Sequence, residues 1–307
     1  MSHPMQANAW AAVPASNVPP ALRVRGLAKH FGGVRALDGV NFEVPSGQCV
    51  ALIGPNGAGK STCFACLAGQ QTPTSGEVLW QGQPLLGKAP AERQRLGVAR
   101  TFQVAQTFEA LTVLQNIQLV LRGAAPLAWW DSLNQRQPER AMRLAAQAGL
   151  QALAHATVAD LPYGDKKRLE LAMALAGLPS SEADPKPALL LLDEPAAGLA
   201  LAERADMMAL VRQVASQGVT VLYTEHNMDA VFGVADRVLV LMQGRLVADG
   251  LPEVVARDPQ VLQHYLGMDF KARPAVPDHT PISAPMNTPT NALINAAHTT
   301  AKGAGHV

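Results

Sequence analysis

The fold is decided by Gly54-Pro55-Asn56-Gly57-Ala58-Gly59-Lys60-Ser61, which Thr62 follows. This stretch fits the pattern G-x-x-x-x-G-K-[ST], in which glycines allow the backbone to wrap closely around a phosphate chain. In such a loop the lysine carries its charge to the β- and γ-phosphates, and the serine offers its hydroxyl to Mg²⁺. Residues 54–62 are therefore predicted to bind a nucleoside triphosphate.

The segments on either side of this phosphate loop support the prediction. The apolar run Cys49–Ile53 is typical of a buried strand, and residues 60–69 favour a helix. A helix that begins at the end of the loop directs its N-terminus, with its partial positive charge, toward the phosphates. Strand, loop and helix thus follow in the order that the motif requires.

Composition limits the other classes of function. The chain has 307 residues, of which 48% are hydrophobic and 16% charged, so it can form a sizeable core. Its net charge of +1 gives no electrostatic reason to expect nucleic acid as a partner. No apolar run reaches the roughly 20 residues that span a bilayer. We expect a cytoplasmic protein with a disordered leader at 1–21, which lacks a secretory signal, and a disordered tail at 271–307.

Two of the three cysteines, Cys63 and Cys66, have the C-x-x-C spacing of redox and metal sites. Both fall in the helix expected after the phosphate loop, and neither a second such pair nor a nearby histidine accompanies them. We therefore expect them to pack as small residues.

The remaining patterns predict an α/β fold: a P-loop NTPase with a parallel core sheet, an antiparallel β layer and an inserted helical subdomain. Strands are expected at 22–25, 40–44, 77–81, 98–102, 189–192, 219–223 and 238–242, and helices at 113–121, 139–150, 166–178 and 202–217. The folded block spans 22–270, and its helical subdomain covers about 104–185.

Polar residues that follow the expected core strands supply a second half of the site. Asp193 ends an apolar run and can hold Mg²⁺ as the partner of Ser61, while Glu194 can polarise an attacking water. His226 lies beyond the strand 219–223 and can donate to the γ-phosphate. Gln103 ends the strand 98–102, and its amide can reach Mg²⁺ or the water.

Taken in order, these motifs resemble the ATP-binding subunit of ATP-binding-cassette (ABC) transporters over residues 22–267. The stretch Leu161-Pro162-Tyr163-Gly164-Asp165-Lys166-Lys167-Arg168, called the signature segment below, stands where that family usually has Leu-Ser-Gly-Gly-Gln. The resemblance implies that Tyr163, Gly164 and Asp165 cap the ATP held by a second subunit. It also implies that Phe31 stacks on adenine.

The chain departs from the family pattern at several of these positions. Pro162 replaces the serine of the signature, so its hydroxyl contact is missing, and Asp165 replaces the glutamine. Ala200 stands where the family often has Asp or Asn. The basic run 166–168 is interpreted as a solvated helix face, since charge runs usually are.

Within that family, the chain resembles one branch more closely: the larger ATP-binding subunit of branched-chain amino acid importers. The sequence runs that carry this resemblance are 99–103, 111–113, 161–165, 193–199 and 224–229. The resemblance implies ATP hydrolysis with Mg²⁺ at the cytoplasmic face of the membrane. The implied partners are a second cassette, identical or not, permease subunits and, indirectly, a periplasmic solute-binding protein. A urea or amide importer, a lipid exporter and, less so, a non-transport ABC ATPase stay open as alternatives.

Overall fold

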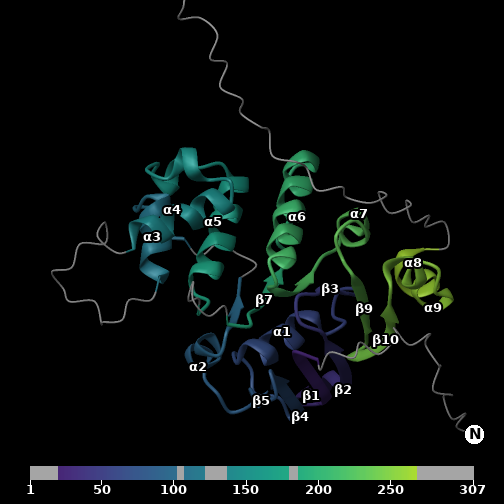
Figure 1. The fold of residues 1–307 in the computed structure, drawn as a ribbon. Coiled ribbons are helices and arrows are strands. Elements are labelled where there is room, and N and C mark those ends of the chain that lie inside the picture. Colours follow the sequence, from purple (N-terminus) through teal and green to yellow (C-terminus); the bar gives the residue numbers. More distant parts are fainter. Residues whose placement is uncertain (1–19, 102–106, 122–136, 180–185, 268–307) are drawn as a thin grey trace, which may run out of the picture. The chain divides into compact units, whose positions relative to one another are not determined.

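The computed structural model describes residues 20–101, 107–121, 137–179 and 186–267 (Figure 1). The predicted tail at 271–307 and all but the last two residues of the leader lie outside the described residues.

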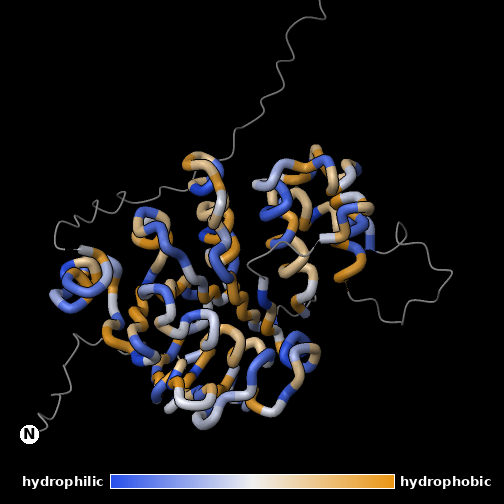
Figure 2. The backbone as a smooth tube through the Cα atoms, turned by 180° about the vertical axis from the view of Figure 1, so that it is seen from behind, coloured by the Kyte–Doolittle hydropathy of each residue, from blue (hydrophilic) through white to orange (hydrophobic). Residues whose placement is uncertain are grey.

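A six-stranded sheet forms the centre, in the order β10-β9-β3-β8-β7-β6. The strands β9, β3, β8, β7 and β6 run parallel, and β10 joins the edge antiparallel to β9. Their bounds are β3 Cys49–Ile53, β6 Val98–Arg100, β7 Leu189–Asp193, β8 Thr220–Thr224, β9 Arg237–Met242 and β10 Arg245–Gly250. Every residue of β3, β7 and β8 is buried, as their uninterrupted apolar runs predict. Figure 2 shows the same concentration of hydrophobic colour on the central strands.

A second sheet is wholly antiparallel, with the order β2-β1-β4-β5. Its strands are β1 Leu22–Phe31, β2 Val34–Val44, β4 Ser75–Trp80 and β5 Gln83–Pro84. The predicted antiparallel layer is thus confirmed, but β1 and β2 are longer than expected. Register shifts between Val24 and His30 interrupt the alternation of apolar and polar residues, and this hides the strand from a periodicity argument.

The helices divide among three hydrophobic clusters. Helix α1, Lys60–Ala68, contributes to the cluster shared by the antiparallel sheet and one face of the central sheet. Helices α6, Leu201–Ser216, and α7, Met228–Phe232, pack on the other face. Helices α3, Val113–Val120, and α4, Pro138–Gln147, form the third cluster with α5, Tyr163–Ala176. Because α5 has residues in two clusters, it joins the helical subdomain to the core.

The shorter helices lie in the connections: α2 Pro90–Arg95, α8 Pro252–Val255, α9 Pro259–Val261, single turns at Gln151–Leu153 and Val158–Asp160, and a π-helical turn at Leu262–Leu266. Cys63 and Cys66 are buried free thiols of α1, and burial raises the pKa of Cys63 to about 12. Within the described ranges, no helix combines the length and the hydrophobicity needed to cross a bilayer.

Candidate functional site

The phosphate loop connects β3 to α1, and strand β9 fixes its first residue. Gly54 has a φ of 148°, and a Cβ at this position would lie 2.0 Å from the carbonyl oxygen of Leu241. Since that oxygen belongs to the backbone of β9, only glycine fits without moving the strand. The Gly244 N–H also donates to the carbonyl of Ala58 at 2.9 Å, so β9 and its following turn hold the loop at Gly54 and at Ala58.

Lys60 lies beneath the loop and is only 7% exposed. Its Nζ donates to the carbonyl of Gly54 at 2.6 Å and to that of Pro55 at 3.1 Å. Burial lowers the pKa of Lys60, while the negative charges of Glu194 and Asp193 raise it. The two carboxylates predicted for the site therefore lie close enough to Lys60 to act on its charge.

Asp193 ends β7, and neighbouring strands hold both of its carboxylate oxygens. Oδ1 accepts from the hydroxyl of Thr224 at the end of β8, at 2.8 Å. Oδ2 accepts from Nη2 of Arg100 at the end of β6, at 2.7 Å. The parallel sheet thus brings Asp193 to the edge where α1 begins with Lys60 and Ser61, as the sequence indicates.

Glu194 follows with a strained backbone and a directed side chain. Its φ of 50° is unusual for a residue with a Cβ, and its N–H donates to the hydroxyl of Thr224 at 3.0 Å. Its Oε1 lies 2.9 Å from Nε2 of His226. Two residues that are 32 positions apart, both predicted to be catalytic, therefore contact each other directly.

The buried carboxylate of Glu225 binds the backbone on both sides of the Glu194–His226 pair. Glu225 accepts from the N–H of Ala196 at 2.8 Å and from that of His226 at 3.2 Å. Burial raises the pKa of Glu225, and the hydrogen bonds from the backbone oppose that rise. Glu225 thus connects the turn after β7 to the turn after β8, which carry Glu194 and His226.

The oxygen donors near Lys60 suit Mg²⁺, which prefers hard ligands and keeps several waters. They are the exposed hydroxyl of Ser61 and the carboxylate of Asp193. Gln103, the third predicted metal ligand, lies outside the described residues. The described part of the chain holds no cluster of three or more His, Cys, Asp or Glu side chains that could bind a metal by itself. The donors therefore fit a cation that is also bound by a nucleotide.

Phe31 ends β1 at the hairpin with β2, and it is 47% exposed. The Nζ of Lys29 lies 4.8 Å from the centroid of its ring and is held there by the carbonyl of Thr72, at 2.8 Å. A flat exposed ring with a cation beside it can offer a stacking surface to a base. The role in adenine binding stays a prediction.

The signature segment forms the start of α5, which begins at Tyr163, three residues earlier than expected. Tyr163 is exposed, whereas Gly164 is buried. A Cβ on Gly164 would lie 3.0 Å from Oε1 of Glu203, a residue in the first turn of α6. The role of Tyr163, Gly164 and Asp165 toward a second subunit's ATP stays a prediction.

The interpretation of residues 166–168 as a solvated face is wrong. Lys167 is 1% exposed, and its Nζ pairs with Glu170 at 3.2 Å and lies 5.8 Å from the centroid of the Tyr163 ring. Lys166 pairs with Glu109 at 3.0 Å, and Arg168 pairs with Asp206 at 3.2 Å. The sequence of this short run could not reveal these ion pairs, because Glu109 and Asp206 are distant from it in the chain.

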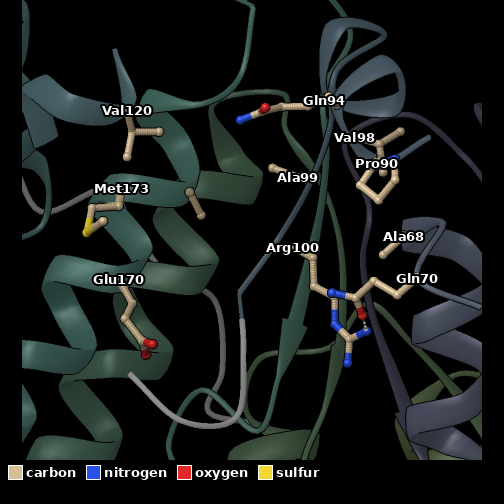
Figure 3. A pocket seen from close by; sticks show the side chains of 12 residues that line it. Ala68, Gln70, Pro90, Gln94, Val98, Ala99, Arg100, Val120, Glu170 and Met173 are labelled. Carbon is tan, nitrogen blue, oxygen red and sulfur yellow. Dashed lines mark hydrogen bonds between the residues drawn. The ribbon is translucent and has the colours of Figure 1, made fainter. Parts of the chain in front are cut away.

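A groove of about 400 Å³ separates the central sheet from the helical subdomain. Figure 3 shows its walls, with Arg100 and Gln70 on the core side and Met173 and Glu170 of α5 opposite. The groove lies beside Arg100, three positions before Gln103 in the chain. The nucleotide-site edge of the sheet and the groove thus share one side chain.

Three residues that organise the site were not among the predicted site residues: Arg100, Thr224 and Glu225. Each lies within three positions of a predicted site residue. All three end parallel strands or directly follow one, and that position was the available signal. Their partners lie on other strands, so the pairing itself was not readable from the sequence.

Comparison with known proteins agrees with this geometry. The family described as "ABC transporter" matches residues 37–197. The branched-chain amino acid transport ATP-binding protein LivG of Escherichia coli is 38% identical over 258 residues, covering 81% of this chain and 98% of LivG. BraF of Pseudomonas aeruginosa, similarly named, has the same identity and coverage.

Solved structures extend the agreement to the fold. The ADP conformation of an ATP-binding cassette of an ABC transporter is 31% identical, with a TM-score of 0.71. The match covers 81% of this chain and 100% of that one. A nucleotide-free cassette gives a TM-score of 0.70 at 30% identity. The predicted α/β cassette fold is therefore confirmed.

Proposed function

Because this chain belongs to the ABC transporter family and is an ATPase of that family, we propose that it energises the import of branched-chain amino acids. One observation carries the choice of solute: LivG and BraF, which are named for branched-chain amino acid transport, match this chain over 98% of their own length. In this function the chain works at the cytoplasmic face of a membrane, bound to permease subunits. A periplasmic solute-binding protein delivers the amino acid to those permeases.

Residues on the core side hold the nucleotide. Phe31 stacks on the base, and the N–H groups of residues 54–62 surround the phosphates. Lys60 exchanges the carbonyls of Gly54 and Pro55 for phosphate oxygens, which carry more charge. Ser61, Asp193 and Gln103 would hold Mg²⁺, which, when bound, neutralises charge on the β- and γ-phosphates.

The contact between Glu194 and His226 supports the hydrolytic step. Glu194 orients a water and accepts its proton as the water oxygen bonds to the γ-phosphorus. The bond from that phosphorus to the bridging oxygen breaks, and the electron pair leaves with ADP. The Nε2–H of His226, 2.9 Å from Glu194, fixes the carboxylate and can turn to donate to a γ-phosphate oxygen instead.

A second cassette completes the site in this proposal. Its signature segment, with Tyr163, Gly164 and Asp165, closes on the γ-phosphate and directs the N-terminus of α5 at it. The permease contacts the surface formed by Gln103 and residues 104–112, so that closure moves the membrane subunits. Binding energy drives the closure, and hydrolysis resets it.

The substitution Glu194→Gln tests the hydrolytic assignment. It should leave the affinity for ATP within about threefold and lower turnover at least a hundredfold, since general-base catalysis contributes about that much. The matched control is Glu77→Gln, which removes an exposed carboxylate on β4 and should keep wild-type turnover. Turnover near the wild-type rate in Glu194→Gln would remove Glu194 from this role.

The solute is tested in proteoliposomes that contain this chain, its permeases and the solute-binding protein. Leucine, isoleucine or valine should stimulate ATP hydrolysis and be taken up, whereas urea and short amides should do neither. Stimulation by urea alone would show that the chain serves a urea or amide importer. Failure to copurify with any permease would contradict a role in transport.

A further inference from the structure

Arg100 makes contacts that the proposed catalytic cycle does not use. It ends β6, and its guanidinium donates through Nη2 to Oδ2 of Asp193 at 2.7 Å. Nη1 donates to Oε1 of Gln70, just beyond α1, and the guanidinium carbon lies 5.9 Å from the centroid of the Phe64 ring. The side chains of Arg100 and Asp193 are only 11% and 7% exposed, so water screens their attraction weakly.

The ion pair occupies the carboxylate on which the metal site depends. One oxygen of Asp193 accepts from Thr224, which is neutral, and the other faces the Arg100 cation. A positive charge this close stabilises the carboxylate and repels a second cation. Mg²⁺ at Asp193 must therefore overcome the charge of Arg100 or displace the guanidinium.

The groove provides space for that displacement. Arg100 lines it, and Glu170 and Met173 of α5 lie on the opposite wall (Figure 3). A side chain at the edge of a cavity of about 400 Å³ can turn without moving the strand that carries it. The strand ends of β6 and β7 can thus stay paired while the carboxylate changes partner.

We propose that Arg100 is a positioning residue that serves as the counter-ion of Asp193 and competes with Mg²⁺ for it. The arginine holds the carboxylate in place without metal, and it sets how strongly nucleotide binding depends on Mg²⁺. This inference rests on the proposed function, because it takes Asp193 as the metal-binding carboxylate of the nucleotide site.

The test compares the dissociation constant of a fluorescent ADP analogue in EDTA with that in saturating Mg²⁺. Removing the Arg100 charge in Arg100→Gln weakens ADP binding without metal, since the site becomes more negative, and strengthens it with metal. The ratio of the dissociation constant in EDTA to that in Mg²⁺ should therefore rise about tenfold, an effect comparable to that of one nearby charge on a pKa. Arg100→Lys keeps the charge, and its ratio should stay within about threefold of wild type.

A matched control separates this effect from the loss of any buried ion pair. Arg237 pairs with Asp249 at 2.6 Å between β9 and β10, and both side chains are largely buried. Residue Val50, near the start of β3, pairs with Arg237, so this pair lies at the opposite end of β3 from the phosphate loop. Arg237→Gln should lower the melting temperature as Arg100→Gln does, and leave the ratio unchanged.

The outcomes are distinct. An unchanged or smaller ratio in Arg100→Gln, with Mg²⁺-dependent binding in wild type, would reduce Arg100 to a structural ion pair. If Arg100→Gln does not fold, Arg100→Lys decides alone, and a ratio changed about tenfold there would overturn the competition. Wild-type protein that binds ADP equally in EDTA and in Mg²⁺ would instead contradict the proposed metal site itself.

Discussion

The phosphate loop and the signature segment both lead into a helix N-terminus, but different parts of the chain hold them. Backbone atoms of β9 and the turn that follows it fix the loop: the carbonyl of Leu241 faces Gly54, and the N–H of Gly244 binds Ala58. Side chains surround the signature segment instead, with Glu203 beside Gly164 and Glu170 bound to Lys167. The loop held by backbone atoms is the one proposed to bind the chain's own nucleotide, and the segment held by side chains is the one proposed to face a neighbour's nucleotide.

The largest expected effect comes from a side chain that clashes with the backbone of β9 beside Gly54. Gly54→Ala places a Cβ 2.0 Å from the Leu241 carbonyl and requires a φ that alanine rarely adopts. We expect the free energy of unfolding to fall by about 4 kcal/mol, as for other severe steric conflicts. Urea denaturation measures this loss.

The loop itself offers the control for that change. Gly57 also has a positive φ, but a Cβ there meets nothing within 4 Å. Gly57→Ala should therefore cost only about 1 kcal/mol, the price of the backbone conformation alone. Equal losses in the two variants would show that the Leu241 carbonyl yields, and would weaken the contrast between the regions.

The next effect concerns Lys60, whose side chain binds two carbonyls of the loop. Lys60→Ala removes the cation beneath the loop and should weaken ATP binding more than a hundredfold, which corresponds to about 3 kcal/mol. Equilibrium titration with a fluorescent nucleotide measures the affinity. Affinity near the wild-type value would refute the assignment of residues 54–62 as the nucleotide site.

A smaller effect is expected from the hydroxyl that joins Asp193 to Glu194. Thr224→Val removes a donor to Asp193 and the acceptor of the Glu194 N–H. We expect the kcat of ATP hydrolysis to fall about tenfold to thirtyfold, since each lost buried hydrogen bond costs about 1 kcal/mol. The affinity for ADP should stay within about threefold.

Strand β8 carries its own control at its other end. Thr220 is also buried, and its hydroxyl accepts from the Gly47 N–H at 3.0 Å. Thr220→Val should lower stability to a similar extent and leave kcat within about twofold. If both variants lose kcat equally, then the effect is one of stability and not of site geometry.

The smallest effect is expected in the signature segment, where side chains and not backbone surround the glycine. Gly164→Ala brings a Cβ to 3.0 Å from a carboxylate oxygen of Glu203, the end of a flexible side chain. We expect a loss of stability of at most about 1 kcal/mol, because Glu203 can turn away. A loss as large as that of Gly54→Ala, measured in the same urea experiment, would mean that both regions are equally rigid.

The sequence predicts the central strands well and the periphery poorly. Residues 49–53, 189–192 and 219–223 are found as strands within one residue, since a strand that is buried on both faces reads as a continuous apolar run. Strand β10 was missed because only Ala248 and Gly250 of its six residues are buried, so it lacks the apolar run of a central strand. The helices α2, α7, α8 and α9 were missed because each has six residues or fewer, too few turns for a helical period to emerge.

In the site, too, some features were predicted from the sequence and others were not. Motif residues such as Lys60, Asp193, Glu194 and His226 are brought together as predicted, because the sheet aligns the ends of parallel strands. Supporting contacts such as that of Arg100 with Asp193 could not be predicted, since they join residues 93 positions apart through strand order. The burial of Lys167 was hidden for a similar reason.

The contact between Gly54 and Leu241 also has a consequence for biosynthesis. A nascent chain that has emerged only to the end of β8 contains the whole phosphate-loop motif, but it lacks the strand that fixes the loop. Domains fold as units during translation, so this chain acquires its nucleotide site only after residue 244 has left the ribosome. A nucleotide bound at the loop would then stabilise the finished domain and not a fragment that ends at β8.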